Sequence, residues 1–516
     1  MRLDGALLAA AMLVVPVGIA RAQQTSPAVS GPGVSEQELQ AAMISAQDAI
    51  GRQDCAGVLA ALDPLVPRLA ETPQRTAIQR FRITCLAAVG RTADLPAVQR
   101  ELAKAMPRDG LVRAFGALIA ADENRFVDAA DQISALAASS PDALQILTGT
   151  AVRAIAVRLS DEKAFDARGR MLVALAQADW QPADQPDLRA SFAEGAIDAL
   201  VKQGRAAEAE ALLDRIEQPE SLAEMAVDRN FSKLWPAIES LMGPGSGTAV
   251  DQFARSRLAI YGQNDRSDLA LRDAANAMLL LHRYQDVVDM TDSVQIATGM
   301  SREAVYTTLY RARALTVLGR RSDAAKLLSG FLKIDPTATP EVSTALVSYA
   351  EFLDEGGQEE EALQAVRATR QGSVPILSDY GMRWIDRTEV CALSALGRTA
   401  EANKALDSLA LLASQNEPAV IEAMLCARRD AEAAKLTTKA FANEDVSDNL
   451  LQQFQPAAST FAPMPSRLRD LWSAFLARPE IKAAFEQHGR ILPRIYWPQA
   501  KPREIPRRPA GGSNLT

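Results

Sequence analysis

Very few residues in this chain have the types needed for catalysis or metal binding. The 516 residues include only two histidines, His282 and His488, and four cysteines. A Ser-His-Asp triad and a histidine-based zinc site both need imidazoles beside other reactive groups. Here one histidine falls at a predicted turn and the other near a predicted helix end. We therefore expect no catalytic constellation, no metal site and no bound cofactor.

The cysteines point to disulfide chemistry, because the chain begins like an exported protein. Arg2 gives a short positive start, residues 5–20 are apolar, and Ala20-Arg21-Ala22 resembles a signal-peptide cleavage site. We expect cleavage after Ala22 and a periplasmic or secreted location. The apolar run is short for a membrane span and no other span follows, so we do not expect an integral membrane protein. Four cysteines in an exported chain suit two disulfides, with buried free thiols as the alternative.

The elements that must position these side chains are short helices. Residues 306–336 form the clearest unit, in which Leu309, Ala312, Leu315 and Leu318 make one apolar stripe at helical spacing. Gly319 ends this first helix, because glycine adopts the left-handed conformation past a helix end at little cost. A second helix follows and stops before Pro336. One such hairpin cannot bury both of its apolar faces, so it needs neighbours stacked against it.

The same turn signal recurs through most of the chain. Several successive turns lie 34–40 residues apart, with a small residue usually five positions later; the turns are centred on Gly51, Gly90, Asn124, Gly204, His282, Gly319, Gly357 and Gly397. The composition, 48% hydrophobic but only 5% aromatic, is typical of closely packed small-faced helices. The pattern favours an all-α solenoid over the alternative, a non-repetitive helical bundle.

The unit at 306–336 resembles the tetratricopeptide repeat (TPR) family. Ala312, Gly319, Ala324 and Pro336 stand at the family's small, turn-glycine, alanine and final proline positions, while Thr308 replaces its large aromatic. The resemblance implies a right-handed superhelical α-solenoid of stacked antiparallel helix hairpins. It also implies peptide binding along a concave face lined by the first helix of each hairpin.

That concave face provides a candidate binding strip. On this resemblance Tyr306, Tyr310 and Arg313 lie on it, and Trp384 and Arg387 take similar places two units later. Aromatic and arginine side chains are frequent energetic anchors of interfaces. We expect the strip to bind an extended, partly acidic segment of a protein or peptide partner. The alternative is that the aromatic side chains fill gaps between hairpins.

The repeat register favours one of the three possible disulfide pairings. Cys55 falls in the second helix of the first unit and Cys85 in the first helix of the next, so these helices should touch. Cys391 and Cys426 occupy nearly equivalent places in consecutive units. We therefore expect bonds between Cys55 and Cys85 and between Cys391 and Cys426, each joining one hairpin to the next.

Changes in composition divide the chain into six parts. The glycine-rich stretch 243–247 is either a hinge or a long turn, with the turn favoured, and the basic, proline-rich C-terminus is expected to be extended and mobile. The parts are a signal peptide (1–22), a disordered linker (23–35), an N-terminal repeat stack (36–242), a C-terminal repeat stack (243–449), a linker with closing helices near 467–476 and 479–489 (450–490), and a tail (491–516).

From the sequence we expect the chain to be a non-enzymatic binding scaffold of the bacterial cell envelope. Its net charge of −8 argues against general nucleic-acid binding. One alternative is an envelope-acting enzyme, since the stretch 238–249 holds Glu-Ser, Leu-Met-Gly and Gly-Thr-Ala pieces that resemble lytic transglycosylase motifs. Another is a structural subunit of a larger envelope complex. The sequence leaves the partner and the oligomeric state open.

Overall fold

The computed structural model describes residues 33–373, 377–461 and 466–506, without the side chains of 373 and 444–448. The expected signal peptide, its cleavage site after Ala22, and nearly all of the linker lie outside these residues. The chain forms two compact units, one up to Ile216 and one from Glu217. Composition predicts a division between residues 242 and 243 instead. Within the described ranges no strand occurs, and no helix is both long and apolar enough to cross a membrane.

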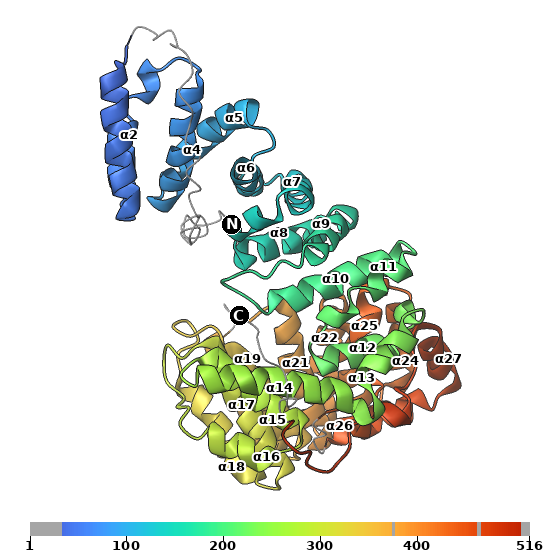
Figure 1. Cartoon of the computed structure of the whole chain (residues 1–516). Coiled ribbons are helices and arrows are strands. Elements are labelled where there is room, and N and C mark those ends of the chain that lie inside the picture. The colour runs from blue at the N-terminus through green and yellow to red at the C-terminus, as the bar shows by residue number, and fades with distance from the viewer. Residues whose placement is uncertain (1–32, 374–376, 462–465, 507–516) are drawn as a thin grey trace. The chain divides into compact units, whose positions relative to one another are not determined.

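Unit 1, which ends at Ile216, consists of successive helix hairpins (Figure 1). In each hairpin the two helices pack against one another, and most hairpins also contact the next. The pairs are α2 (Glu36–Gly51) with α3 (Cys55–Leu62), α4 (Pro73–Ala88) with α5 (Leu95–Ala105), α6 (Gly110–Asp122) with α7 (Phe126–Ser139), α8 (Gly149–Asp161) with α9 (Phe165–Gln177), and α10 (Leu188–Lys202) with α11 (Ala206–Glu210).

Unit 2 begins with three helices and continues as regular hairpins. The opening helices are α12 (Pro219–Val227), α13 (Trp235–Met242) and α14 (Gly247–Gln263). The hairpins are α15 (Asp268–Leu280) with α16 (Tyr284–Met290), α17 (Arg302–Val317) with α18 (Arg321–Ser329), α19 (Val342–Glu355) with α20 (Glu359–Ser373), α21 (Asp379–Ala395) with α22 (Thr399–Ala410), and α23 (Glu417–Cys426) with α24 (Asp430–Phe441). The first helices α15, α17, α19, α21 and α23 stack consecutively. The fold is thus all-α and TPR-like.

Left-handed residues close the hairpins where glycine signals predict turns. Gly90, Gly204, Gly319, Gly357 and Gly397 all have φ between 72° and 78°. Asn124 and His282, the two non-glycine turn positions named from the sequence, also have positive φ, of 59° each. In the first hairpin the left-handed residue is Gln53 rather than Gly51, because Gly51 still belongs to α2.

Two further turns carry no sequence signal. Lys163 and Arg428 have φ of 58° and 60° and join α8 to α9 and α23 to α24. A lysine or arginine in this conformation is uncommon. A backbone hydrogen bond closes each turn, from Ala164 N–H to Leu159 O and from Arg429 N–H to Met424 O, both at 2.8 Å. These two turns complete the repeat pattern in regions where the glycine signal is missing.

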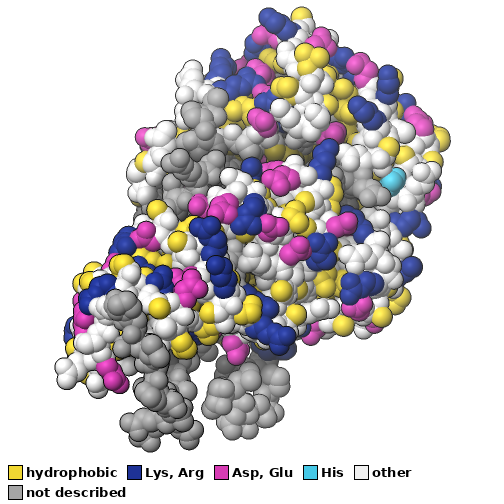
Figure 2. Space-filling view, turned by 90° about the horizontal axis from the view of Figure 1, so that it is seen from above, with side chains coloured by type: hydrophobic (Ala, Val, Ile, Leu, Met, Phe, Trp, Pro, Cys, Tyr) yellow, Lys and Arg dark blue, Asp and Glu magenta, His cyan; other side chains and the backbone are white. Residues whose placement is uncertain are grey.

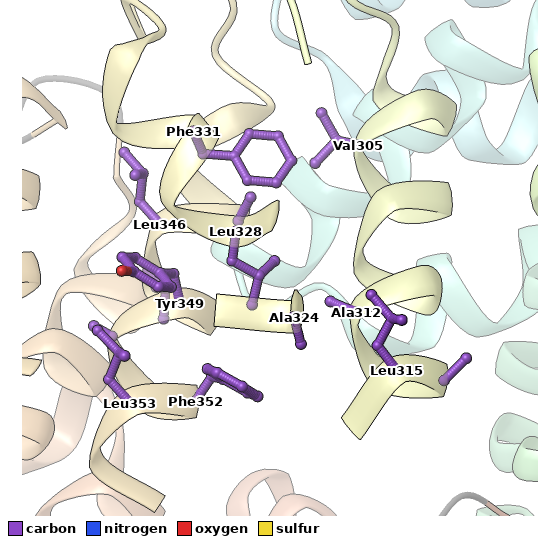
Figure 3. Close-up of a cluster of buried hydrophobic side chains, with 14 of the residues drawn as sticks. Val305, Ala312, Leu315, Ala324, Leu328, Phe331, Leu346, Tyr349, Phe352 and Leu353 are labelled. Atoms are coloured by element: carbon purple, nitrogen blue, oxygen red, sulfur yellow. The ribbon is translucent and has the colours of Figure 1, made fainter. Parts of the chain in front are cut away.

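The cores are built from small and branched side chains between stacked helices. In Figure 3, Ala312 and Leu315 of α17, Leu328 of α18, Phe352 of α19 and Phe331 point toward one another. Phe331 lies just after α18 and has no exposed surface. Alanines on facing helices allow close approach, and the larger side chains fill the remaining space.

The four cysteines form the predicted pairs. Cys55 of α3 is bonded to Cys85 of α4, with their Cα atoms 4.8 Å apart. Cys391 of α21 is bonded to Cys426 of α23, with a Cα separation of 5.0 Å. Each bond joins one hairpin to the next, the first in unit 1 and the second in unit 2.

The end of unit 2 returns to its beginning. Two short helices, α26 (Arg467–Leu476) and α27 (Pro479–His488), form where the sequence predicts closing helices. They pack on α23 and α24, and α27 also contacts the 3-10 turn Arg229–Phe231 that follows α12. Asp228 and Gly489 then form an isolated antiparallel bridge. The stack of unit 2 is therefore closed on itself, although the repeat pattern predicts a simple capped end.

Candidate functional site

The predicted strip on α17 faces the interior of unit 2. Tyr306 is half-buried beneath the Arg302 guanidinium, 5.6 Å from its ring centroid. Tyr310 and Arg313 are more enclosed, and burial raises the pKa of Tyr310 to about 12. Burial also lowers the pKa of Arg313, opposed by the nearby carboxyl of Glu220. The helical spacing thus brings Tyr310 and Arg313 to one face, and that part of the face is turned inward.

Arg313 and Glu220 line a small polar cavity. The cavity has a volume of about 160 Å³ and lies among α12, α15, α17 and the segment after α25 (Glu444–Gln453). Burial raises the pKa of Glu220, while Arg313 and a hydrogen bond with Asn276 oppose that rise. The carboxyl and guanidinium groups make the centre of unit 2 polar, with apolar walls that include Phe461 and Leu492.

Arg387 is placed differently from the prediction, because its donors are used inside the protein. Its side chain is 3% exposed, and its nitrogens lie 2.7 Å from Glu351 Oε1, 2.9 Å from Glu422 Oε1 and 3.5 Å from Asp354 Oδ2. A buried guanidinium needs carboxylates around it, and the first helices on either side of α21, namely α19 and α23, supply them. Arg387 therefore holds hairpins together and is not available to a partner's carboxylate.

Trp384, the remaining residue of the strip, lies beside Arg387. The guanidinium carbon of Arg387 lies 5.1 Å from its ring centroid, and Tyr380 contacts its edge with ring centroids 6.4 Å apart. Of the five strip residues, Tyr310 and Arg313 thus share one polar interior region, and Trp384 and Arg387 share another. Tyr306 lies outside both.

The buried charge cluster around Arg387 contains more carboxyls than cations. We define the cluster as Arg387, Glu351, Asp354, Glu355 and Glu422, with Arg467 of α26. Arg467 Nη2 lies 2.5 Å from Asp354 Oδ1, and Trp472 Nε1 donates to Glu422 Oε2 at 2.6 Å.

Three carboxyls of this cluster have pKa values raised toward neutral pH. Burial, opposed by Arg387, raises the pKa of Glu351 to about 7 and that of Asp354 to about 6. Burial likewise raises the pKa of Glu355. The cluster fastens the closing helix α26 to α19 and α23, and part of it changes charge near physiological pH.

The C-terminal segment is anchored, although the sequence predicts a mobile tail. We call residues 489–506 the strap; they run, mostly without regular structure, across the ends of α12 to α15. Arg490 binds Glu239, Arg503 binds Asp251, and the Arg503 backbone N–H donates to Leu281 O at 2.9 Å. Prolines keep the strap extended, as predicted, but arginine–carboxylate pairs hold it in place. The last basic residues, Arg507 and Arg508, lie outside the described range.

The glycine-rich stretch 243–247 is the surface on which the strap lies. It forms a tight turn within unit 2, with φ of 66° at Gly243 and 61° at Gly245. A Cβ at Gly245 would come within 3.2 Å of Gln499 Cγ, and one at Gly247 within 2.9 Å of an Arg503 nitrogen. This stretch is therefore a turn within unit 2 and not a hinge between two stacks. Its glycines let another segment of the chain approach closely.

The described part of unit 1 offers a different kind of surface, an open groove with an apolar floor. The groove has a volume of about 610 Å³ and lies between the α6–α7 turn and α8. Phe126 is buried in its floor, Val157 is 51% exposed, and Arg153 and Arg158 stand on its α8 side. Arg158 reaches over the Phe126 ring, 5.5 Å from the centroid, and pairs with Asp161 at 3.3 Å.

One face of the molecule is mixed in charge. On the face shown in Figure 2, Lys and Arg side chains alternate with Asp and Glu and with apolar side chains. Among the described residues no group of three or more His, Cys, Asp and Glu side chains could hold a metal ion. Glu239, from the stretch that resembles lytic transglycosylase motifs, binds Arg490 at 2.5 Å and accepts from the Tyr496 hydroxyl at 3.2 Å.

Several site residues do not appear in the sequence prediction. Glu351, Asp354 and Glu355 lie at spacings of three and four on α19, which is otherwise apolar on its buried faces. Such carboxyls on an inward stripe could have indicated a buried ionic cluster. No sequence signal marks the groove of unit 1, because its floor comes from two hairpins and depends on how they pack.

Comparisons with known proteins found a likeness only among solved structures. No family model and no curated protein matches the chain. The crystal structure of the P58(IPK) TPR domain is similar at 14% identity, covering 70% of this chain and 99% of that one, with a TM-score of 0.20. The structure of Naa15/Naa10 bound to HypK-THB is similar at 13% identity, covering 77% and 67%, with a TM-score of 0.24. The fold assignment rests on the helix hairpins themselves.

Proposed function

We propose that this protein is an exported, non-enzymatic scaffold of the bacterial cell envelope that binds a protein or peptide partner through unit 1. The groove between the α6–α7 turn and α8 carries this proposal, because it combines an apolar floor with exposed cations. Interfaces commonly use apolar and arginine anchors of this kind. Val157, about half exposed, is the side chain that a partner would cover first.

The internal use of the predicted strip supports this choice of surface. Arg387 is already paired with three carboxyls, and Tyr310 and Arg313 face the polar cavity of unit 2. Binding a partner there would require unit 2 to open. Arg153, by contrast, is exposed beside the groove and pairs with no acidic side chain among the described residues.

Affinity purification from an envelope fraction tests the binding surface. The variant Arg153→Glu with Val157→Asp reverses one charge and adds a negative charge to the groove lining. Both positions are exposed, so the variant should still fold. The control is Ile260→Asp, which changes a similarly exposed apolar residue on α14 of unit 2. We expect the groove variant to lose proteins that the wild type and the control both capture. Identical captured proteins for all three chains would exclude this groove.

Export has its own test. The N-terminal residues have signal-peptide character, and disulfides of this kind persist in oxidising compartments. N-terminal sequencing of the protein from a periplasmic fraction should begin at Gln23, and alkylation without reduction should label no cysteine. Four reactive thiols, or an unprocessed N-terminus in the cytoplasmic fraction, would contradict the envelope location.

A further inference from the structure

The strap has the conformation of a bound linear peptide. It contains Pro493, Pro498, Pro502 and Pro506. Pro493 and Trp497, which flank a single 3-10 turn at Arg494–Tyr496, adopt polyproline-like angles, with φ near −60° and ψ near 135°. Proline-rich segments of this shape make good ligands because little chain entropy is lost when they bind. The surface beneath the strap therefore has the features of a peptide-binding site that is filled by a segment of its own chain.

The first anchor of the strap is Arg490. Its Nη2 lies 2.5 Å from Glu239 Oε1, and its Nε donates to Ala226 O at 2.8 Å. The guanidinium also stacks on Trp235, 3.6 Å from the ring centroid. A carboxylate, a carbonyl and an aromatic face together recognise the planar guanidinium, which a lysine could not match.

The second anchor is Arg503. Its Nη2 lies 2.8 Å from Asp251 Oδ2 and 3.3 Å from Gly247 O. Between the two anchors, Ser246 holds a left-handed conformation at φ 54° and donates its hydroxyl to Tyr496 O at 2.6 Å. The positive φ of a non-glycine residue directs this donor at the strap backbone. We call Trp235, Glu239, Ser246 and Asp251 the cradle.

The contacts between strap and cradle are polar and partly solvent-accessible. Arg490 and Arg503 keep 24% and 22% of their side-chain surface exposed. Leu492 is buried, whereas Ile495 and Ile505 are 61% and 42% exposed. A segment with so few buried apolar contacts can open locally at lower cost than the hairpins beneath it.

We propose that the cradle is a binding site for an extended, proline-containing segment of a partner protein that carries two arginines, and that the strap occupies this site in the resting state. The two carboxylates select a basic segment by charge. Trp235 and the glycine turn select arginine and a closely approaching backbone. The partner's segment would displace the strap, and its apparent affinity is reduced by the fraction of molecules in which the strap is bound. This site is independent of the groove in unit 1.

A labelled synthetic peptide with the sequence of residues 487–506 tests the proposal on the full-length chain. The variant Arg490→Ala with Arg503→Ala weakens the strap but leaves the cradle intact. We expect it to bind the peptide at least tenfold more tightly than the wild type does, measured by fluorescence anisotropy. The matched control is Lys501→Ala, which removes an exposed cation from the same strap and should bind the peptide as the wild type does.

Two further arms address specificity and folding. A peptide in which the arginines equivalent to Arg490 and Arg503 are replaced by glutamine should not bind, and adding Glu239→Gln and Asp251→Asn to the double variant should abolish binding of the original peptide. Circular dichroism checks that each chain is folded; if the double variant is not, Arg503→Ala alone replaces it. Hydrogen exchange on the wild type should show the Arg490 and Arg503 amides opening before those of α17 and α19. Equal affinity of wild-type and weakened chains, binding of the glutamine peptide, or strap amides that exchange only with global unfolding would each overturn the proposal.

Discussion

Replacing Glu351 with glutamine should stabilise unit 2 at alkaline pH. Burial gives the Glu351 carboxyl a pKa of about 7, whereas the ordinary pKa of a glutamate in an unfolded chain is 4.5. The folded state therefore binds this proton more tightly than the unfolded state does. The resulting stability is present below about pH 4.5 and is lost as the pH rises through 7, where the buried carboxyl must ionise.

The size of the effect follows from the pKa difference. Ionising this carboxyl above pH 7 costs at most about 3.4 kcal/mol of unfolding free energy, since each pKa unit corresponds to 1.36 kcal/mol. The side chain keeps 28% of its surface exposed, so the real value will lie below this limit. Glutamine preserves an oxygen acceptor for Arg387 without the ionisation cost. We expect the melting temperature at pH 8.5 to rise by roughly 5 °C.

The assay is thermal unfolding followed by circular dichroism at several pH values between 5 and 8.5. The variant should gain stability relative to the wild type as the pH rises, and the two should converge toward pH 5. The control is Glu401→Gln, which removes a carboxyl from an exposed pair with Arg398 and should leave the pH profile almost unchanged. If Glu351→Gln is destabilised at every pH by the same amount, Glu351 is ionised throughout and the reasoning is wrong.

Three further changes test the fold. Arg387→Ala should destabilise unit 2 by about 3–5 kcal/mol in urea unfolding, because it leaves buried carboxyls without their cation; a change below 1 kcal/mol would mean that water already reaches the cluster. Serine at both Cys391 and Cys426 should cost about 2–4 kcal/mol, and an unchanged urea midpoint would show that the thiols are unpaired in solution. Gly319→Val should cost about 1 kcal/mol or more, because a β-branched residue is strained at φ 78°; an unaltered melting temperature would contradict the turn geometry.

Local signals were sufficient for most of the fold. The stripe from Leu309 to Leu318 and the stop at Gly319 predict a hairpin that the structure contains as α17 and α18. The disulfide pairs follow from the same register, because residues at equivalent places in neighbouring repeats lie close together. The turns at Lys163 and Arg428 were not predictable, since lysine and arginine do not favour the left-handed backbone that they adopt there.

The site was less predictable because its contacts join distant segments. Helical spacing places Tyr310 and Arg313 on one face but does not say whether that face is open or covered. What covers the interior of unit 2 comes from residues after 450, far along the chain. Arg387 illustrates the same limit, because its carboxyl partners lie on two other hairpins. The sequence alone does not distinguish an exposed helical arginine from one that is buried among carboxylates.

The bridge between Asp228 and Gly489 has a consequence for how the protein is made. A chain synthesised from its N-terminus can assemble the hairpins of unit 1 first, and Cys55 lies only 30 residues from its partner Cys85. Unit 2 can be completed only later, because its opening helices contact residues that are synthesised last. During that interval Trp235 and the carboxylates of Glu239 and Asp251 have no strap, and they are open to whatever arginine-bearing segment is nearby. Loss of the last residues through early termination or proteolysis would make that transient state permanent.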